Sequence, residues 1–256
     1  MKTVILAGGL GSRLSEETRF RPKPMVEIGG RPILWHILKY YSHHGHNDFI
    51  ICCGYMSYII KEYFFHYMLH NSDVTIDTSS NEVTYANSTS ENWKITLVET
   101  GLYTQTAGRL SKVREYLDDE PFFFTYGDGL STVDLKALQA THKEQEALAT
   151  LTVVQTPGRY GSVKSENGKV TQFIEKIPDE EYGRINGGFF ICDPKVLDRI
   201  KGPESSWEYD VLPTLVEEQS LASYSHSGFW MCMDTVRDLT RLQELWDGGQ
   251  CPWKVW

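Results

Sequence analysis

Hydrophobic residues alternate between two patterns at the start of this chain. Short apolar runs at residues 2–7 and 48–54 are typical of buried strands. A helix is expected at residues 32–41, because Pro32 suits a first helical turn and Gly45 suits the end of a helix. Apolar residues at helical spacing predict a second helix at residues 56–69. This order of strand, helix, strand and helix predicts a parallel sheet with helices on its faces.

The middle of the chain departs from this rhythm. Three short strands are expected within residues 73–99, and the polar run at residues 87–92 is expected to be a loop. A loop that includes Thr100-Gly101 and residues 106–109 is expected next, followed by a helix to about residue 117. The three expected strands are 74–77, 83–85 and 95–98.

The second half returns to apolar runs separated by turn signals. Residues 121–126 form the strongest run, and Asn167-Gly168 is typical of the turn of a hairpin. Capping-box spacings that begin at Ser205 and at Thr235 predict two helix starts. No long linker divides the chain, so we expect one domain over residues 1–256. The other expected elements are a helix at 134–145, strands at 148–155 and 185–192, hairpin arms at 163–165 and 169–175, and a last helix with Leu239, Leu242, Leu245 and Trp246 on its apolar face.

Composition is that of an ordinary globular protein, with 41% hydrophobic residues. No apolar run approaches the roughly 18 residues that a membrane helix needs, and no signal-peptide pattern opens the chain. The five cysteines are odd in number and include no C-x-x-C pair, which argues against disulfides and structural zinc. A reducing, cytoplasmic compartment is therefore expected.

Charge is distributed unevenly along the chain. The formal net charge is −9, which disfavours nucleic acid as a partner. Residues 1–31 nevertheless carry a net charge of +3, which leaves −12 for the remainder. A local basic patch on an acidic protein favours a small polyanion over a long one.

A glycine-rich turn directly follows the first strand. Gly8, Gly9 and Gly11 lack a Cβ, so the backbone can approach a ligand closely and direct its N–H groups toward an anion. Arg13 and Lys23, which stands between two prolines, add positive charge. The segment predicts a site for nucleotide phosphates; a plain strand-to-helix turn is the alternative.

Two known phosphate loops do not fit this turn. The dinucleotide fingerprint G-x-G-x-x-G fails because Leu14 stands where the third glycine is needed. The ATPase loop requires Gly-Lys followed by Ser or Thr, which the chain lacks. A dinucleotide-binding dehydrogenase is therefore disfavoured.

Two aspartates follow apolar runs and are candidate metal ligands. Asp128 lies between two glycines where a predicted strand ends, and ligands of parallel sheets bind at such ends. Asp234 follows the apolar run 228–233. Two carboxylates that converge could hold Mg²⁺, which prefers oxygen ligands. The alternatives are a turn aspartate that bonds its own backbone and an aspartate that helps to cap the last helix.

Residues near the predicted hairpin are candidates for a second phosphate and for sugar hydroxyls. Lys176 follows a predicted strand and could neutralise a phosphate, although a solvent-exposed lysine is the alternative. Asn186 precedes Gly187-Gly188 within a predicted strand, where glycines favour a bulge or a close ligand. A covalent mechanism has no support, because no nucleophile motif is present.

These motifs resemble those of the sugar-phosphate nucleotidyltransferases. The resemblance begins with Ala-Gly-Gly-Leu-Gly-Ser-Arg-Leu at residues 7–14 and Pro-Lys-Pro-Met at residues 22–25. Further likenesses, over nearly the whole chain, indicate the branch that acts on CTP and glucose 1-phosphate. They lie at residues 14–18, 25–30, 33–37, 48–54, 124–129, 185–190 and 252–254.

The resemblance implies an α/β fold with a Rossmann-like mixed sheet flanked by helices, the nucleotide-diphospho-sugar transferase fold. It implies transfer of a cytidylyl group from CTP to α-D-glucose 1-phosphate, which gives CDP-glucose and pyrophosphate for deoxysugar and surface-polysaccharide synthesis. Mg²⁺ is the implied cofactor. A homo-oligomer is also implied, with contacts from the middle and C-terminal parts, and with neither nucleic acid nor membrane as a partner.

The resemblance also gives each candidate residue a role. Arg13, Lys23 and Lys176 would be the catalytic cations, acting on the departing pyrophosphate, the α-phosphorus and the sugar phosphate. Asp128 and Asp234 would hold Mg²⁺. The nucleotide would be bound by Leu6, Ala7, Gly8, Gly9, Gly11, Ser12, Arg13, Lys23, Thr106 and Arg109, and glucose 1-phosphate by Glu175, Lys176, Asn186 and Gly187.

Two other functions stay open at this point. The first is the same reaction with dTTP, UTP or GTP, because a few pocket atoms decide the base. The second is a nucleotide-sugar binding protein without turnover, which the presence of every charged residue opposes. The chain departs from the usual family pattern at Ile177, where proline is usual, and at Met231-Cys232, where Gln-Pro is usual.

Overall fold

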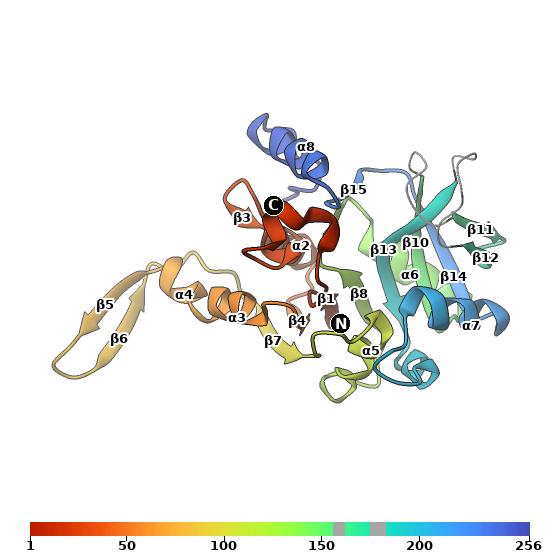
Figure 1. Cartoon of the computed structure of the whole chain (residues 1–256), viewed down its shortest axis with the longest axis horizontal. Coiled ribbons are helices and arrows are strands. Elements are labelled where there is room, and N and C mark those ends of the chain that lie inside the picture. Colours follow the sequence, from red (N-terminus) through yellow and green to blue (C-terminus); the bar gives the residue numbers. More distant parts are fainter. Residues whose placement is uncertain (156–161, 175–182) are drawn as a thin grey trace.

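A nine-stranded mixed sheet forms the centre of the computed structural model, which describes residues 1–155, 162–174 and 183–256 (Figure 1). Its strand order among the described residues is β10-β14-β12-β11-β13-β8-β1-β4-β7. The strands are β1 (Thr3–Leu6), β4 (Asp48–Cys53), β7 (Lys94–Glu99), β8 (Phe122–Tyr126), β10 (Ala149–Gln155), β11 (Ser162–Glu166), β12 (Lys169–Ile174), β13 (Arg184–Cys192) and β14 (Leu221–His226).

The first half of the sheet is parallel, as the alternation of strands and helices predicts. β1 pairs in parallel with β4 and with β8, and β4 pairs in parallel with β7. The carboxyl ends of these four strands therefore share one edge of the sheet. The glycine turn, which follows β1, and Asp128, which follows β8, both lie at this edge.

The second half of the sheet is antiparallel in most of its pairs. β13 runs antiparallel to β8 and to β10, and β10 pairs in parallel with β14. The predicted hairpin of β11 and β12 is confirmed: Asn167 and Gly168 take φ values of 51° and 78°, as a tight hairpin turn requires. Residues 175–182, which include part of the predicted second arm, lie outside the described residues.

Helices cover both faces of the sheet. Ile5 of β1 packs into one core cluster, while Val4 and Leu6 pack into the other, so each face of this strand is buried. The helices are α1 (Ser15–Thr18), α2 (Ile33–His43), α3 (Ser57–Phe65), α4 (Tyr67–His70), α5 (Thr106–Ser111), α6 (Leu135–Gln145), α7 (Leu212–Glu217) and α8 (Val236–Asp247). Shorter helical turns lie at Ser12–Leu14, Lys23–Met25, Arg114–Tyr116, Pro194–Arg199 and Trp207–Val211. No helix of the described residues is long and apolar enough to cross a membrane.

Three predicted helix boundaries are wrong. The helix expected over residues 56–69 divides at His66 into α3 and α4, although its apolar face continues across the break. The helix expected between residues 109 and 117 instead spans Thr106–Ser111, so it begins within the expected loop. It also ends earlier than expected, because Val113 is buried in the core and its N–H donates to the Leu110 carbonyl oxygen, three residues back. The first capping box is displaced by one residue: Ser206 caps the following turn by accepting from Tyr209.

The second predicted capping box is confirmed. The Thr235 hydroxyl accepts from the Asp238 N–H, and the Asp238 carboxylate accepts from the Thr235 N–H. This reciprocal pair fixes the start of α8 directly after Asp234.

Within the described part of the chain, three two-stranded ribbons accompany the main sheet. β9 (Gly129–Ser131) pairs with β15 (Trp230–Cys232), and β2 (Glu27–Ile28) pairs with β3 (Arg31–Pro32). β5 (Asp73–Asp77) and β6 (Glu82–Ala86) form a third ribbon, which projects beyond the body of the molecule past α4 (Figure 1). The sequence predicts the strands of this third ribbon, but not that they leave the main sheet.

Candidate active site

The β9–β15 ribbon brings the two candidate metal-binding aspartates together. Asp128 lies in the turn between β8 and β9, and Asp234 lies between β15 and α8. Cys232 stands opposite Gly129 in the ribbon, and the Met233 N–H donates to the Asp128 carbonyl oxygen at 2.9 Å. One ligand atom each from Asp128, Cys232 and Asp234 lies within 4.8 Å of the others. Residues 106 positions apart in the sequence thus converge at one point.

Lys23 joins this pair of carboxylates. Its Nζ donates to Asp128 Oδ2 at 2.5 Å and to Asp234 Oδ1 at 2.7 Å. Burial alone would lower the pKa of Lys23, but the two neighbouring carboxylates outweigh burial and raise it above its ordinary value. The ammonium therefore stays charged at neutral pH.

The turn that carries Lys23 is fixed by close packing. Pro24 lies against Gly127, where a Cβ would stand 2.6 Å from the Leu6 carbonyl oxygen and 3.0 Å from Pro24 Cγ. Gly11 has a φ of +63°, and a Cβ there would stand 3.2 Å from Lys23 Cβ. Only glycine at these two positions lets the turns after β1 and β8 approach Lys23 so closely.

The glycine turn presents both backbone and charge beside this cluster. Gly9 has nothing within 4 Å of an added Cβ, and Ser12 is exposed in the short helical turn that follows. Arg13 Nη1 donates to Asp234 Oδ2 at 2.9 Å, while 72% of its side chain stays exposed. The structure thus places Arg13, Lys23 and both aspartates in one connected ionic cluster.

Arg109 and Thr106 lie behind the glycine turn rather than on its open side. Arg109 is 4% exposed, and its guanidinium donates to Thr100 Oγ1 at 2.7 Å and to the Gly101 carbonyl oxygen at 2.8 Å. It lies directly beneath Gly8, where an added Cβ would meet its Nη1 at 2.2 Å. Arg109 therefore ties together the turns that follow β1, β4 and β7.

Thr106 links α5 to the helical turn at Trp207–Val211. Its hydroxyl donates to Glu208 Oε2 at 2.7 Å and accepts from the Trp207 N–H at 2.8 Å. Leu6 and Ala7, also predicted to bind nucleotide, are buried where β1 ends.

On the predicted sugar side, Asn186 and Gly187 lie in β13 beside β8. Asn186 Nδ2 donates to the Tyr126 hydroxyl at 3.4 Å, and that hydroxyl donates to Glu208 Oε1 at 2.5 Å. The Gly187 carbonyl oxygen accepts from Trp230 Nε1 at 2.7 Å. Gly188 has a φ of +76° and presses on the Tyr126 ring, which explains the paired glycines in this strand. Glu175 and Lys176 lie outside the described residues.

Sequence reasoning missed three members of this region. Cys232 shares the aspartate cluster, and Tyr126 and Glu208 connect the predicted nucleotide and sugar sides. A signal exists for Cys232, since it stands two residues before Asp234 in an extended run. The capping-box spacing that begins at Ser205 includes Glu208, but it predicts only a helix start, because the partners of Glu208 come from distant elements.

The donor set of this cluster fits a hard divalent cation. Asp128 and Asp234 offer carboxylate oxygens, which Mg²⁺ prefers together with the phosphate oxygens of a substrate. Burial and the neighbouring Asp128 raise the pKa of the Cys232 thiol, so it stays protonated and is a poor ligand. The two aspartates alone are therefore suited to hold the metal.

Comparison with known proteins agrees with this geometry. A model of the nucleotidyl transferase family matches residues 2–247. The chain is 52% identical over 257 residues to the glucose-1-phosphate cytidylyltransferase of Salmonella typhi, and the match covers 100% of both chains. It is 43% identical, again over 100% of both chains, to the probable glucose-1-phosphate cytidylyltransferase of Bacillus subtilis.

Solved structures confirm the expected fold. HddC from Yersinia pseudotuberculosis superposes with a TM-score of 0.76 at 23% identity, over 96% of this chain and 99% of that one. A UDP-glucose pyrophosphorylase complexed with UDP-glucose superposes with a TM-score of 0.75 at 16% identity, over 97% of this chain and 98% of that one. The architecture is the nucleotide-diphospho-sugar transferase fold implied by the sequence.

Proposed function

The chain belongs to the nucleotidyl transferase family, and on this premise we propose that it transfers the cytidylyl group of CTP to glucose 1-phosphate. The products are CDP-glucose and pyrophosphate. The structural observation that supports this most is the Lys23 ammonium bonded to two carboxylates beside an open glycine turn. The choice of CTP over the other nucleotides rests on the full-length likeness of the chain to cytidylyltransferases.

The reaction joins two polyanions, so positive charge is its main requirement. A phosphate oxygen of glucose 1-phosphate forms a bond to the α-phosphorus of CTP, and the bond from that phosphorus to the β-phosphate oxygen breaks. The attacking oxygen is already anionic, so no strong base is needed. Phosphoryl transfers of this kind depend on positioning and on cations that neutralise charge.

Lys23 and Arg13 meet this requirement on the nucleotide side. We assign Lys23 to the α-phosphate and Arg13, whose side chain is largely exposed, to the departing pyrophosphate. Gly8, Gly9, Gly11 and Ser12 would present backbone and hydroxyl donors to the phosphates. In the structure both cations bond the aspartates, so an arriving triphosphate competes with Asp128 and Asp234 for them.

Asp128 and Asp234 would hold Mg²⁺ once the phosphates take over the cations. The ion, when bound, would supply additional charge neutralisation at the phosphates. Arg109 and Thr106 would act from behind the turn, since their polar groups bond protein atoms that shape it.

Asn186 and Gly187 would border the glucose 1-phosphate site. Asn186 is half-buried in β13 and bonds the Tyr126 hydroxyl, which is tied to Glu208. Glu175 and Lys176 stay predicted ligands of the sugar phosphate. We also propose that the chain forms a homo-oligomer. We propose a reducing cytoplasmic compartment, because all five cysteines are free and three of them are buried.

A panel of four nucleotides tests the reaction. The chain is incubated with glucose 1-phosphate, Mg²⁺ and either CTP, dTTP, UTP or GTP, and released pyrophosphate is measured. We expect release with CTP, and none without the sugar phosphate or the metal. Faster release with another nucleotide would contradict the assignment of CTP, and tight CTP binding without any release would indicate a binding protein.

A further inference from the structure

The carboxylate of Glu208 is a meeting point for three hydroxyl groups. Its Oε1 accepts from the Tyr126 hydroxyl at 2.5 Å. Its Oε2 accepts from Thr106 Oγ1 at 2.7 Å and from Ser206 Oγ at 2.9 Å. These donors come from β8, from α5 and from the residue that caps the Trp207–Val211 turn. The described groups that bond this carboxylate are all neutral, so its charge is balanced by hydroxyl donors from separate segments.

The carboxylate of Glu208 also fixes the direction of the Tyr126 hydroxyl. An ionised carboxylate can only accept, so the Tyr126 O–H donates to it. The phenol oxygen is then left to accept, and Asn186 Nδ2 donates to it at 3.4 Å. Asn186 Oδ1 accepts from the Gly188 N–H at 2.8 Å, so both ends of this amide are oriented. Glu208 thus acts on the Asn186 amide through one intervening phenol.

Packing fixes the ring of Tyr126 but leaves its hydroxyl free to turn. Tyr126 ends β8, two residues before Asp128, and its ring meets that of Phe190 edge to face, with 5.9 Å between the centroids. A Cβ on Gly188 would stand 2.6 Å from Tyr126 Cδ2, so the ring has no space to shift in that direction. A phenol hydrogen rotates toward whichever acceptor is present. The Glu208 carboxylate is that acceptor.

We propose that Glu208 is a positioning residue for the sugar phosphate. It keeps the Tyr126 oxygen available as an acceptor for one N–H of Asn186, and the second N–H of that amide donates to a hydroxyl of the sugar. This inference rests on the proposed function, in which Asn186 borders the glucose 1-phosphate site. A donor that is oriented before its ligand arrives costs less to order on binding, so the gain appears as affinity for the sugar phosphate.

The variant Glu208→Gln disturbs one side of this network more than the other. It keeps the size of the side chain but replaces one acceptor oxygen by an NH₂ donor. Because Thr106 and Ser206 both donate to Oε2, we expect the amide oxygen to stay on their side. The NH₂ group then faces Tyr126, whose hydroxyl can no longer donate to it. The variant therefore misdirects the Tyr126 hydroxyl and leaves the Thr106 bond in place.

Steady-state kinetics with the full chain separate this role from a general one. We expect Glu208→Gln to raise KM for glucose 1-phosphate by roughly 3- to 10-fold, with kcat and KM for CTP changed by less than about twofold. Tyr126→Phe removes the intervening hydroxyl and should have a similar effect. The double variant should be no worse than either single variant, because both break the same chain of bonds.

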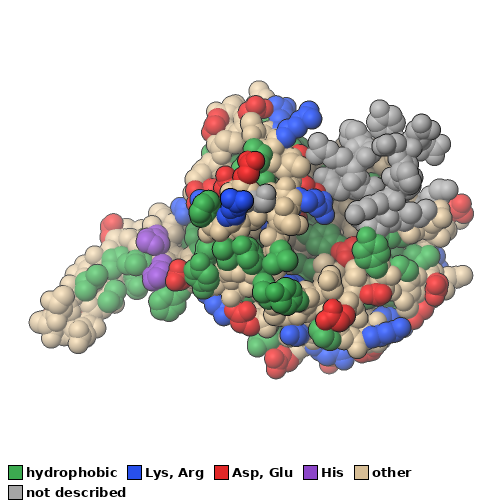
Figure 2. Space-filling view, viewed as in Figure 1, with side chains coloured by type: hydrophobic (Ala, Val, Ile, Leu, Met, Phe, Trp, Pro, Cys, Tyr) green, Lys and Arg blue, Asp and Glu red, His purple; other side chains and the backbone are tan. Residues whose placement is uncertain are grey.

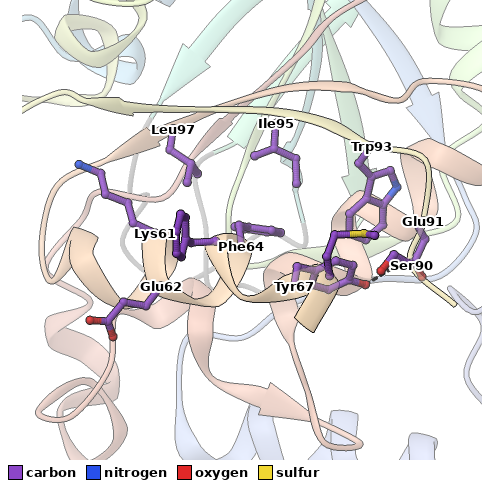
Figure 3. Close-up of a pocket in the computed structure, with 11 residues that line it drawn as sticks. Lys61, Glu62, Phe64, Tyr67, Ser90, Glu91, Trp93, Ile95 and Leu97 are labelled. Carbon is purple, nitrogen blue, oxygen red and sulfur yellow. Dashed lines mark hydrogen bonds between the residues drawn. The ribbon is translucent and has the colours of Figure 1, made fainter. Parts of the chain in front are cut away.

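Two other glutamates provide matched controls for the loss of a carboxylate. Exposed acidic side chains are scattered over the body of the molecule (Figure 2), and both controls are exposed. Glu62 lies on α3 beside an apolar groove, with its carboxylate directed away from the apolar side chains (Figure 3). Glu217 ends α7, in the segment that follows Glu208. Glu62→Gln and Glu217→Gln should leave all three kinetic constants within about twofold of wild type.

Analogues of glucose 1-phosphate that each lack one sugar hydroxyl test the contact itself. One analogue should have a raised KM with the wild-type chain, and Glu208→Gln should raise that KM little further, because the contact is already lost. Losses that add for every analogue would refute the proposal. An equal rise in KM for CTP, or a fall in kcat alone, would also refute it, once circular dichroism shows that the variants are folded.

A binding measurement distinguishes failure of this inference from failure of the proposed function. A wild-type chain that releases no pyrophosphate with any nucleotide would contradict the proposed reaction. Calorimetric titration of glucose 1-phosphate into that chain in the presence of CTP would then test Glu208 directly. Weaker binding to Glu208→Gln than to Glu217→Gln would support the positioning role, and equal binding to both would overturn it.

Discussion

The ionic cluster and the β5–β6 ribbon are opposites in how their side chains find partners. Lys23 bonds both Asp128 and Asp234, although the three residues come from separate parts of the chain. Ile76 and Val83 are neighbours on two adjacent strands, and about half or more of each remains exposed among the described residues. The first region is completed by folding, and the second is left incomplete by it.

This difference separates two kinds of function. In the ionic cluster, the cations are paired with carboxylates until phosphates compete for them. Such a cluster is suited to chemistry on small anions. The ribbon presents apolar area to solvent, which is unfavourable by about 25 cal/mol for each Å² left exposed. Exposed apolar surfaces of this kind are typical of sites that contact a protein, a membrane or a ligand.

The largest effect is expected from the two aspartates. Asp128→Asn and Asp234→Asn each should lower Mg²⁺-dependent pyrophosphate release by on the order of 10³-fold or more, because a metal supplies several kcal/mol to such reactions. The control Asp198→Asn alters an exposed ion pair with Arg114 and should leave turnover unchanged. If both variants turned over at the wild-type rate, Asp128 and Asp234 would not be the metal ligands. The ionic cluster would then differ from the ribbon in its contacts but not in its importance for turnover.

A somewhat smaller effect is expected from Lys23→Met. Loss of one charge-stabilising group costs about 3 kcal/mol, so turnover should fall by on the order of 10²- to 10³-fold. Lys2 stands just before β1, at the opposite end of that strand from the glycine turn, and bonds Asp118, so Lys2→Met is the control. Titration with Mg²⁺ alone should also show tighter binding to Lys23→Met, because the ammonium no longer competes for the two carboxylates. Weaker Mg²⁺ binding would contradict that competition.

The buried residue His36 is expected to make the stability of the fold depend on pH. Burial lowers the pKa of His36 to about 4, even though its Nε2 bonds the Ile28 carbonyl oxygen. Trp253 Nε1 donates to His36 Nδ1, so protonation there places two donors against each other. The unfolded chain takes up this proton near pH 6.5, so stability is full above that pH and falls by roughly 3 kcal/mol as the pH drops to about 4.

Denaturant unfolding at several pH values measures this effect. We expect His36→Gln to reduce the acid-dependent loss of unfolding free energy relative to the wild-type chain. Equal losses in the two proteins would show that His36 is not the responsible group. The ribbon segment, residues 71–93, contains no histidine and should contribute nothing to this histidine-dependent loss.

The smallest effect on chemistry is expected from the ribbon. Ile76→Asp with Val83→Asp should change pyrophosphate release per chain by less than about threefold, because surface substitutions away from a site seldom perturb it. A large loss of turnover in this folded variant would show that the two regions are coupled.

Much of the fold could be predicted because its signals are local. The apolar runs of β1, β4 and β8 and the Asn167-Gly168 turn each follow from a few adjacent residues. Predictions failed where contacts between distant residues decide where an element ends. The helix α5 ends at Ser111, for example, because Val113 packs into the core. The position of β5 and β6 outside the main sheet depends on the whole chain, so strand propensity alone does not show it.

The sequence by itself determined the chemical inventory: a glycine turn, two cations near the N-terminus and two aspartates at the ends of apolar runs. Only the tertiary structure decided that Lys23 bridges both aspartates, because the pairing of β9 with β15 draws Asp234 to Asp128. It also decided that Arg109 lies behind the glycine turn, and that the apolar face of the ribbon stays uncovered. The physical reason is the same in each case: residue types are local, but burial and pairing depend on which distant strands meet.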